Sequence, residues 1–297
     1  MIFRSPLYAN EEVLSDSSGL KFTFLQFSDV HVGHPINRPV HKRLQAAVQL
    51  ANNSQAAFVI DSGDMTNHPV YEASETNLAE FAEYRKYMAA LEMPLYLLPG
   101  NHDIGYFDPQ GDTHHGGKPW GDYQELVSVY RKEMGPLDQS FEYKGVRFIL
   151  VNNNPARSGG PGFLSDKQLA WVERQLKSSS PAFLFCHVPL FARTTGKPWG
   201  KSSRQLIDLC EKYGVAAVGY GHEHPPHAKI KEIAGTRYIM CPDLKVPGHE
   251  SVLRYRVFED HFELCLVDVF SRRITPVGSY RYPLRPDPAK TNSTSSM

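Results

Sequence analysis

The stretch LYLLPGNHD, residues 95–103, decides how the rest of the chain is interpreted. The four apolar residues at 95–98 predict a short buried strand, and the Pro-Gly pair that follows predicts a sharp end to it. An amide, an imidazole and a carboxylate then stand together at Asn101, His102 and Asp103. A strand that delivers polar residues to its carboxyl end is a common way for an α/β protein to build a site on a rigid scaffold.

Four other stretches repeat this arrangement, in which an apolar run is followed by side chains with oxygen or imidazole donors. The runs lie at 21–27, 57–60, 182–185 and 215–218. The donors that follow them are Asp29 and His31, then Asp64, then His187, and finally His222 and His224. The repetition makes a functional site a much stronger prediction than any one of these stretches would be alone.

The first two thirds of the chain alternate predicted strands with predicted helices. Apolar spacing indicates helices at 40–52, 72–91, 123–134 and 203–213, and a capping box, Ser165-x-x-Gln168, begins another. The last third is mostly strand, at 238–240, 252–258 and 262–269, and a turn at 259–261 predicts antiparallel pairing. An α/β fold with two sheets packed face to face and helices outside both would accommodate this order.

Composition limits the domain plan and the partners. We expect residues 1–20 to be an irregular lead-in, residues 21–284 to form one domain, and the Pro- and Ser-rich residues 285–297 to be a disordered tail. The 32 basic and 32 acidic residues give zero net charge, which argues against long nucleic acid as a partner. The four single cysteines are typical of buried residues in a reducing compartment. The absence of an apolar leader or of an 18-residue apolar run predicts a cytoplasmic protein without a membrane span.

The donor residues predict a metal site. The candidate ligands are Asp29, His31, Asp64, Asn101, His187, His222 and His224. Oxygen and imidazole donors without a thiolate favour Mn²⁺, Fe or Zn²⁺. Seven ligands are too many for one catalytic ion, but they suit two ions that share a bridging carboxylate. Within Asp29-x-His31 and His222-x-His224, the two side chains would point the same way if the backbone stays extended.

A pair of metal ions suggests phosphoester hydrolysis. Two ions about 3.5–4 Å apart hold a bridging hydroxide and an ester oxygen in place for an in-line displacement. His102 is the candidate general acid for the leaving alkoxide, and we expect Asp103 to accept its other N–H and fix its tautomer. The candidate contacts to the substrate are His34, Asn101 and Arg157.

The motifs D-x-H, G-D, G-N-H-D, H and G-H-x-H occur here in the order found in the calcineurin-like metallophosphoesterases, which this chain resembles between residues 22 and 225. The resemblance implies a four-layer α/β/β/α sandwich of two mixed sheets with flanking helices. It implies that Asp64 bridges two metals, the first held by Asp29, His31 and His224, and the second by Asn101, His187 and His222. Asn67 stands where purple acid phosphatases have a tyrosine ligand, so an iron–tyrosinate centre is not expected. The stretch GDMT at 63–66 is similar to that of class III cyclic-nucleotide phosphodiesterases.

These observations predict a dinuclear metal hydrolase that acts on a small phosphodiester such as a cyclic nucleotide. A phosphomonoesterase acting on a phosphoprotein or a small phosphate is the main rival, and zero net charge disfavours a nuclease. A binding module that holds metals without catalysis is an alternative from another class. A redox di-metal protein is disfavoured, because its ligands usually lie in Glu-x-x-His motifs on helices. The oligomeric state is not predicted.

Overall fold

The computed structural model describes residues 17–35, 40–69, 74–105, 114–115, 118–119, 122–154, 162–177 and 181–284. Most of the predicted lead-in, the predicted tail at 285–297 and the candidate substrate contact Arg157 lie outside the described residues. Among the described residues, no helix has the length and apolar character needed to cross a membrane. The four cysteines are all buried and unpaired, as their apolar surroundings predicted.

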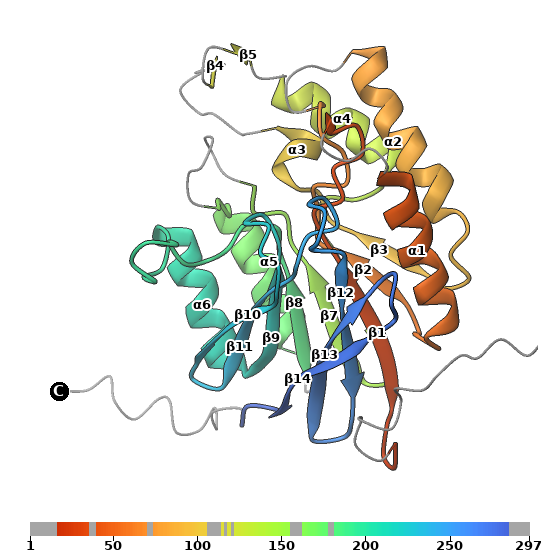
Figure 1. Ribbon diagram of the computed structural model, residues 1–297. Helices are drawn as coiled ribbons and strands as arrows, with labels where there is room; N and C mark the ends of the chain where they lie inside the picture. Colours follow the sequence, from red (N-terminus) through yellow and green to blue (C-terminus); the bar gives the residue numbers. More distant parts are fainter. Residues whose placement is uncertain are drawn as a thin grey trace, which may run out of the picture.

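The first sheet has six strands and contains both ends of the described chain (Figure 1). Its order is β14 (Ile274–Arg281), β13 (His261–Asp268), β12 (Ser251–Val257), β1 (Phe22–Phe27), β2 (Val59–Asp61) and β3 (Leu95–Leu97). The three strands β1, β2 and β3 run parallel, whereas β12, β13 and β14 pair antiparallel. The sheet is therefore mixed, and its parallel half carries three of the predicted site loops.

The second sheet also has six strands and is mixed. Its order is β10 (Lys229–Ile233), β11 (Thr236–Met240), β9 (Val215–Tyr220), β8 (Ala182–Phe185), β7 (Val146–Leu150) and β6 (Gln139–Tyr143). The four central strands are parallel, and each edge strand joins its neighbour as an antiparallel hairpin. A separate short pair is formed by β4 (His114–His115) and β5 (Lys118–Pro119), which the sequence analysis did not predict.

Among the described residues, three of the six helices begin at a side-chain cap. The six helices are α1 (Val40–Asn53), α2 (Glu75–Met88), α3 (Asn101–Ile104), α4 (Tyr123–Glu133), α5 (Asp166–Leu176) and α6 (Lys201–Tyr213). Ser74, Asp122 and Ser165 cap α2, α4 and α5 by accepting a backbone N–H, and the predicted capping box at Ser165 is confirmed. α6 ends at Gly214, whose left-handed backbone suits glycine.

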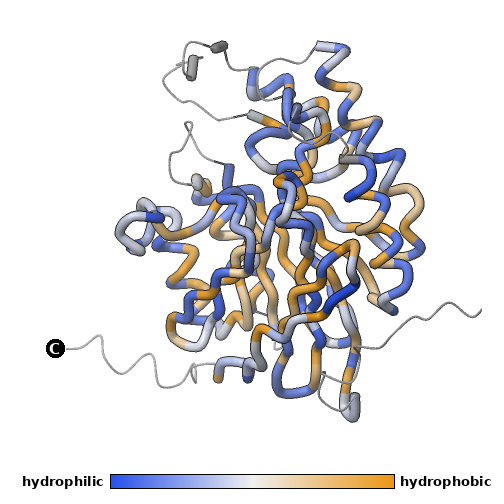
Figure 2. The backbone as a smooth tube through the Cα atoms, viewed as in Figure 1, coloured by the Kyte–Doolittle hydropathy of each residue, from blue (hydrophilic) through white to orange (hydrophobic). Residues whose placement is uncertain are grey.

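Three apolar clusters separate four layers of secondary structure. One cluster packs α1, α2 and α4 onto the outer face of the first sheet, and another packs α5 and α6 onto the outer face of the second. The third lies between the sheets and is rich in aromatic rings, such as Phe24 stacked on Tyr255 at 4.4 Å between centroids. In Figure 2 the hydrophobic residues are concentrated along the strands in the interior of the molecule. The four-layer sandwich with two mixed sheets is confirmed.

Three expectations about the strands need correction. β3 is half-buried rather than buried, because it is the edge strand of its sheet. The last third is not wholly antiparallel, since β11 returns beside β9 and pairs with it in parallel. The sequence analysis also missed the edge strands β10 and β14, in which exposed and half-buried residues obscure the apolar pattern.

The fold brings the carboxyl ends of parallel strands from both sheets together. Asp29 and Asp64 follow β1 and β2 in one sheet, and His187 and His222 follow β8 and β9 in the other. The loops after β1 and β2 are bonded side by side, through Asp29 N to Gly63 O (2.9 Å) and His31 N to Asp64 O (2.9 Å). The loops after β8 and β9 are joined by Gly221 N to His187 O (3.1 Å). The predicted site therefore lies where the two sheets meet.

Candidate metal centre

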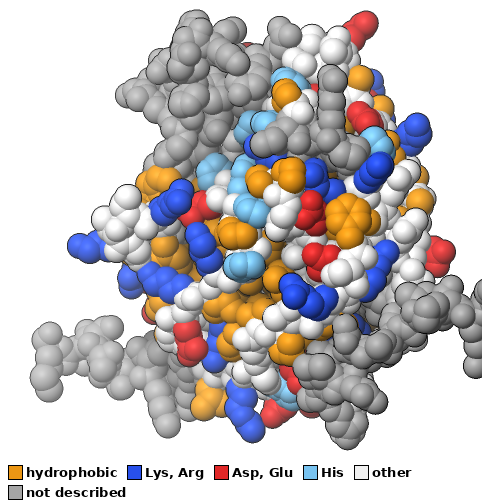
Figure 3. Space-filling model, in the orientation of Figure 1, with side chains coloured by type: hydrophobic (Ala, Val, Ile, Leu, Met, Phe, Trp, Pro, Cys, Tyr) orange, Lys and Arg blue, Asp and Glu red, His pale blue; other side chains and the backbone are white. Residues whose placement is uncertain are grey.

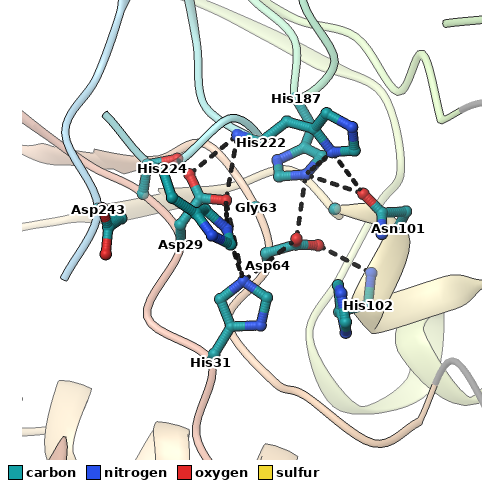
Figure 4. Close-up of polar contacts among 12 residues, drawn as sticks. Asp29, His31, Gly63, Asp64, Asn101, His102, His187, His222, His224 and Asp243 are labelled. Atoms are coloured by element: carbon teal, nitrogen blue, oxygen red, sulfur yellow. Dashed lines mark hydrogen bonds and ion pairs between the residues drawn. The ribbon is translucent and has the colours of Figure 1, made fainter. Parts of the chain in front are cut away.

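All seven predicted metal ligands converge at this position (Figure 4). Two groups of ligand atoms each lie within 4.8 Å of one another: Asp29, His31, Asp64 and His224 in one, and Asp64, His187 and His222 in the other. Asn101 joins the second group, since its Oδ1 lies 2.8 Å from His222 Nδ1 and 3.2 Å from His187 Nε2. Asp64 belongs to both groups, which is the position the sequence predicted for it.

One oxygen of Asp64 links the two groups. Asp64 Oδ2 lies 3.4 Å from His31 Nε2 and 3.3 Å from His187 Nε2, and those two histidines come from different sheets. Its other oxygen accepts the backbone N–H of His102 at 2.8 Å. The second hydrogen bond fixes the carboxylate plane, so that one oxygen faces both groups.

Hydrogen bonds hold the imidazole rings with one nitrogen turned inward. His187 Nδ1 lies 2.9 Å from the Ser62 carbonyl oxygen and donates to it, which leaves Nε2 as the nitrogen directed at Asp64. His31 Nδ1 lies 3.3 Å from Asn67 Oδ1, and this contact leaves the Nε2 atom of His31 directed at the carboxylate of Asp64. A partner on the outer nitrogen is what selects the tautomer of a metal-binding histidine.

The centre is buried although it is built from ionisable groups. Asp29, His31 and His187 are fully buried, Asp64 and Asn101 are 1% exposed, and His222 and His224 reach the surface in part. Buried carboxylates are costly unless a cation or hydrogen bonds compensate them. Figure 3 shows histidine side chains gathered on the accessible face. Oxygen and imidazole lone pairs that converge on shared points therefore fit metal ions, and the absence of thiolate fits Mn²⁺, Fe or Zn²⁺.

The pKa values of these groups depend on one another. Burial would raise the pKa of Asp64, but the charges of His187 and His102 hold it well below its usual range. Burial lowers the pKa of His187, and the charge of Asp64 outweighs this and raises it to about 9. Burial and the charge of His187 together lower the pKa of His222 to about 4. The carboxylate is thus ionised, and positive charge beside it is favoured.

The backbone at the ligand pairs is left-handed rather than extended, so the expected reason for the convergence is wrong. Asp29 and His31 have φ values of 53° and 51°, and His222 and His224 have values of 75° and 47°. Asp64 has a φ of 57° as well. Each such residue costs on the order of 1–3 kcal/mol, which the surrounding structure must offset. Strain concentrated at five of the candidate ligands is typical of a functional site.

Small residues next to the ligands allow the loops to approach closely. A Cβ on Gly221 would lie 2.2 Å from Asp29 Oδ2 and 2.0 Å from Ser28 Oγ. Gly63 has a φ of +102°, and its Cβ would lie 2.8 Å from His187 Nδ1. These positions need glycine because the donor atoms occupy the space that a side chain would take.

His102 lies beside the first group, but Asp103 makes no hydrogen bond to its ring. The His102 ring centroid is 4.5 Å from that of His31, and its Nδ1 donates to the Asn67 carbonyl oxygen at 2.8 Å. Asp103 instead accepts the backbone N–H groups of Asp64 and Thr66 (both 2.9 Å) and the Thr66 hydroxyl (2.7 Å). The predicted role of Asp103 in fixing the tautomer is therefore wrong, and this carboxylate holds the loop after β2.

Of the candidate substrate contacts, His34 and Asn101 lie at the centre. The His34 ring centroid is 6.2 Å from that of His31, and burial and the charge of Lys245 lower the pKa of His34 to about 4. Asn101 is turned toward His187 and His222, as a ligand would be. Arg157 is outside the described residues, so its prediction stays untested.

Three supporting residues were missed by the sequence analysis. Asn67 contacts both His31 and His102, through its side-chain oxygen and its carbonyl oxygen respectively. Glu80, on α2, accepts the Asn67 N–H at 2.8 Å and holds that turn in place. Asn153 accepts the N–H groups of His187 (3.1 Å) and Val188 (3.0 Å). Only their position beside a ligand in the folded chain distinguishes them from ordinary polar residues.

Comparisons with known proteins agree with the geometry. The family model described as Calcineurin-like phosphoesterase matches residues 22–226. Human serine/threonine-protein phosphatase CPPED1 (Homo sapiens) is 27% identical over 200 residues, which cover 61% of this chain and 58% of that protein. The match thus spans less than two thirds of the human protein.

A second relative and a solved structure extend the comparison. The probable glycerophosphodiester phosphodiesterase GpdQ of Arcobacter nitrofigilis is 25% identical over 214 residues, which cover 67% of this chain and 71% of that protein. A dimetal phosphatase from Danio rerio superposes with a TM-score of 0.62 at 15% identity, covering 89% of this chain and 99% of that one. At this identity the superposition shows a common fold.

Proposed function

Because the chain belongs to the calcineurin-like phosphoesterase family, we propose that it hydrolyses phosphoester bonds at a pair of metal ions. The observation that carries the proposal is the pair of ligand groups that share Asp64. One set of donors would hold a single ion, whereas two sets around one carboxylate suit two ions in contact with the same substrate.

The residues divide between the two ions as their positions suggest. Asp29, His31 and His224 would hold the first ion with Asp64, and Asn101, His187 and His222 would hold the second with it. When bound, the ions would supply Lewis acidity for the water and the phosphate oxygens. Mn²⁺, Fe and Zn²⁺ all accept this set of nitrogen and oxygen donors.

His102 is the proposed proton donor. Its Nδ1–H is occupied by the Asn67 carbonyl oxygen, so Nε2 is the nitrogen that remains for the substrate. As an imidazolium, His102 would give the Nε2 proton to the leaving alkoxide. Burial lowers the pKa of His102 below its usual value, and the charge of Asp64 opposes this shift, so Asp64 is the neighbour that favours the proton-donating form.

A small phosphodiester, such as a cyclic nucleotide, is the proposed substrate. The support comes from the GDMT stretch at 63–66 and from GpdQ, which matches a larger share of both chains than the human protein does. A phosphomonoester is the second candidate, and similarity to the human serine/threonine-protein phosphatase favours it. Both classes need the same metal pair, so the site alone does not choose between them.

The proposal is tested with the purified full chain loaded with Mn²⁺. Rates on bis(p-nitrophenyl) phosphate and on p-nitrophenyl phosphate compare a diester and a monoester that share a leaving group. A panel of cyclic nucleotides follows, with Asp64→Asn as the control. We expect faster hydrolysis of the diester and loss of both activities in Asp64→Asn. Faster hydrolysis of the monoester would favour the phosphatase, and no hydrolysis of either substrate would favour a binding module.

A further inference from the structure

A segment outside the motifs lies against the metal centre. This segment, residues 241–250, connects β11 to β12, and none of the predicted site residues belongs to it. Cys241 N bonds the carbonyl oxygen of Tyr220 at 2.7 Å, directly before the loop that carries His222. Leu244 N bonds the Ser28 carbonyl oxygen at 3.2 Å, next to Asp29. The segment is therefore attached to one ligand loop from each sheet.

Lys245 follows Leu244, and its backbone is held in place. Its carbonyl oxygen accepts Arg43 Nη1 at 3.3 Å, and Arg43 is itself buried and paired with Glu250 at 3.2 Å. The side chain of Lys245 is half-buried. A carboxylate partner would offset the cost of removing part of its ammonium from water.

No described residue provides that partner. Within the described residues, the Lys245 ammonium has no hydrogen bond and no ion pair. Its carboxylate neighbour in the segment, Asp243, is fully buried and bound to His249 Nδ1 and to the Val246 N–H, both at 2.6 Å. Figure 4 shows Asp243 on the same side of the site as His224. The acid within the same segment is thus already satisfied, and the ammonium remains available to a ligand.

The charges that act on Lys245 belong to the metal centre. Burial lowers its pKa, while the carboxylates of Asp64, Asp29 and Asp243 raise it. In return, its charge lowers the pKa values of four imidazoles, His31, His34, His102 and His224. The hydrogen bond of Leu244 to Ser28 attaches the segment next to Asp29, and the charge of Lys245 acts there on the first ligand group and His102.

We propose that Lys245 is a substrate-binding residue whose ammonium contacts the phosphoryl group of the substrate and of the phosphate product. The inference rests on the proposed function. A lone ammonium binds a phosphoryl oxygen through a charge-assisted hydrogen bond, and its flexible stem needs no fixed geometry. Its charge acts on both His34 and His102, so it would supply a cation on the side where the proposed leaving group departs. His34 and His102 carry no positive charge when their imidazoles are neutral.

The test measures binding of inorganic phosphate by titration calorimetry, which needs no turnover. The parent, Lys245→Met and Lys245→Arg are compared at equal Mn²⁺ content, with Lys229→Met as the control, because Lys229 is an exposed lysine on β10. We expect Lys245→Met to weaken phosphate binding by about ten- to hundredfold, the range for a lost charge-assisted hydrogen bond. Lys245→Arg should recover most of the affinity, and Lys229→Met should match the parent.

A steady-state measurement separates this inference from the proposed function. If the parent hydrolyses phosphoesters, Lys245→Met should raise KM more than it lowers kcat. Phosphate binding within twofold of the parent would overturn the role of Lys245 while leaving the hydrolase intact. Lower Mn²⁺ content in Lys245→Met, or equal losses in the Met and Arg variants, would also overturn it, since either would indicate a structural role. If the parent binds phosphate through Lys245 but hydrolyses no phosphoester, the proposed function fails and the anion subsite stands.

Discussion

Asp64 is the residue at which the two halves of the site depend on each other. Its Oδ2 atom faces a histidine from each sheet, while its own backbone N–H is held by Asp103 at 2.9 Å. The sequence identified Asp64 and six other donors because each stands at the end of an apolar run. It assigned Asp103 a wrong contact, because a side chain's direction within a turn depends on backbone angles that residue types do not specify.

His102 provides a prediction at the residue scale. His102→Asn should keep the metal content of the parent, because none of the contacts within the two ligand groups uses its ring. Hydrolysis should fall by about 10²–10⁴-fold for diesters with poor alkoxide leaving groups, the usual contribution of a general acid. Loss should be much smaller for p-nitrophenyl esters, whose leaving group needs no proton. Equal losses on the two kinds of ester would contradict the acid role.

Asp61 gives a pH prediction for the metal-free protein. Burial raises its pKa to about 7, against the ordinary 3.8, although the Tyr84 hydroxyl donates to it at 2.7 Å. Between about pH 4 and pH 7 the folded chain therefore holds a proton that the unfolded chain has released. The free energy of unfolding should accordingly decrease as the pH rises through this window.

The Asp61→Asn variant lacks this titration. In denaturant unfolding with a chelator present, its stability relative to the parent should increase from pH 4 to pH 7 by up to about 4 kcal/mol. Other groups titrate in the same range and affect both proteins, so their contribution largely cancels in the difference between them. Asp103 is one of these groups, because burial and the charge of Asp64 raise its pKa to about 7 as well. A difference that stays constant with pH would show that Asp61 is ionised in the folded chain.

At the element scale, the loops after the parallel strands determine the site geometry. The strands and helices were largely predictable, because buried runs and capping residues mark them in the sequence. The edge strands β10 and β14 were not, since half of each faces water and polar residues interrupt the apolar pattern. Asn153 and Lys245 were not predictable either, because their proximity to His187 and His34 depends on contacts between loops that are distant in the sequence.

Gly221 tests the close approach of two loops. Gly221→Ala should weaken metal binding severely, because the new Cβ would lie 2.2 Å from Asp29 Oδ2. Gly248→Ala is the matched control: this glycine has a φ of +92°, and nothing lies within 4 Å of an added Cβ. The control should lose only about 1 kcal/mol of stability to backbone strain and keep its metal. Normal metal content in Gly221→Ala would mean that the two loops are not tightly fixed.

On the scale of the whole molecule, two sheets each contribute part of one buried cluster of charge. A ligand that binds only the folded chain stabilises it by mass action, and a hundredfold excess over Kd contributes about 2.7 kcal/mol. Saturating Mn²⁺ should therefore raise Tm by about 5 °C or more above that of the chelator-treated protein. The same addition should shift Asp64→Asn far less. Identical Tm values with and without metal would indicate that the cluster is stable without ions.

Metal stoichiometry tests the central claim most directly. The full chain, reloaded with Mn²⁺ and freed of excess metal, is analysed by inductively coupled plasma mass spectrometry, together with Asp29→Asn and Asp64→Asn. Because the structure holds two ligand groups that share Asp64, we predict two ions per parent chain, about one in Asp29→Asn and fewer than one in Asp64→Asn. A parent without tightly bound metal, or an Asp64→Asn variant that retains both ions, would contradict the account.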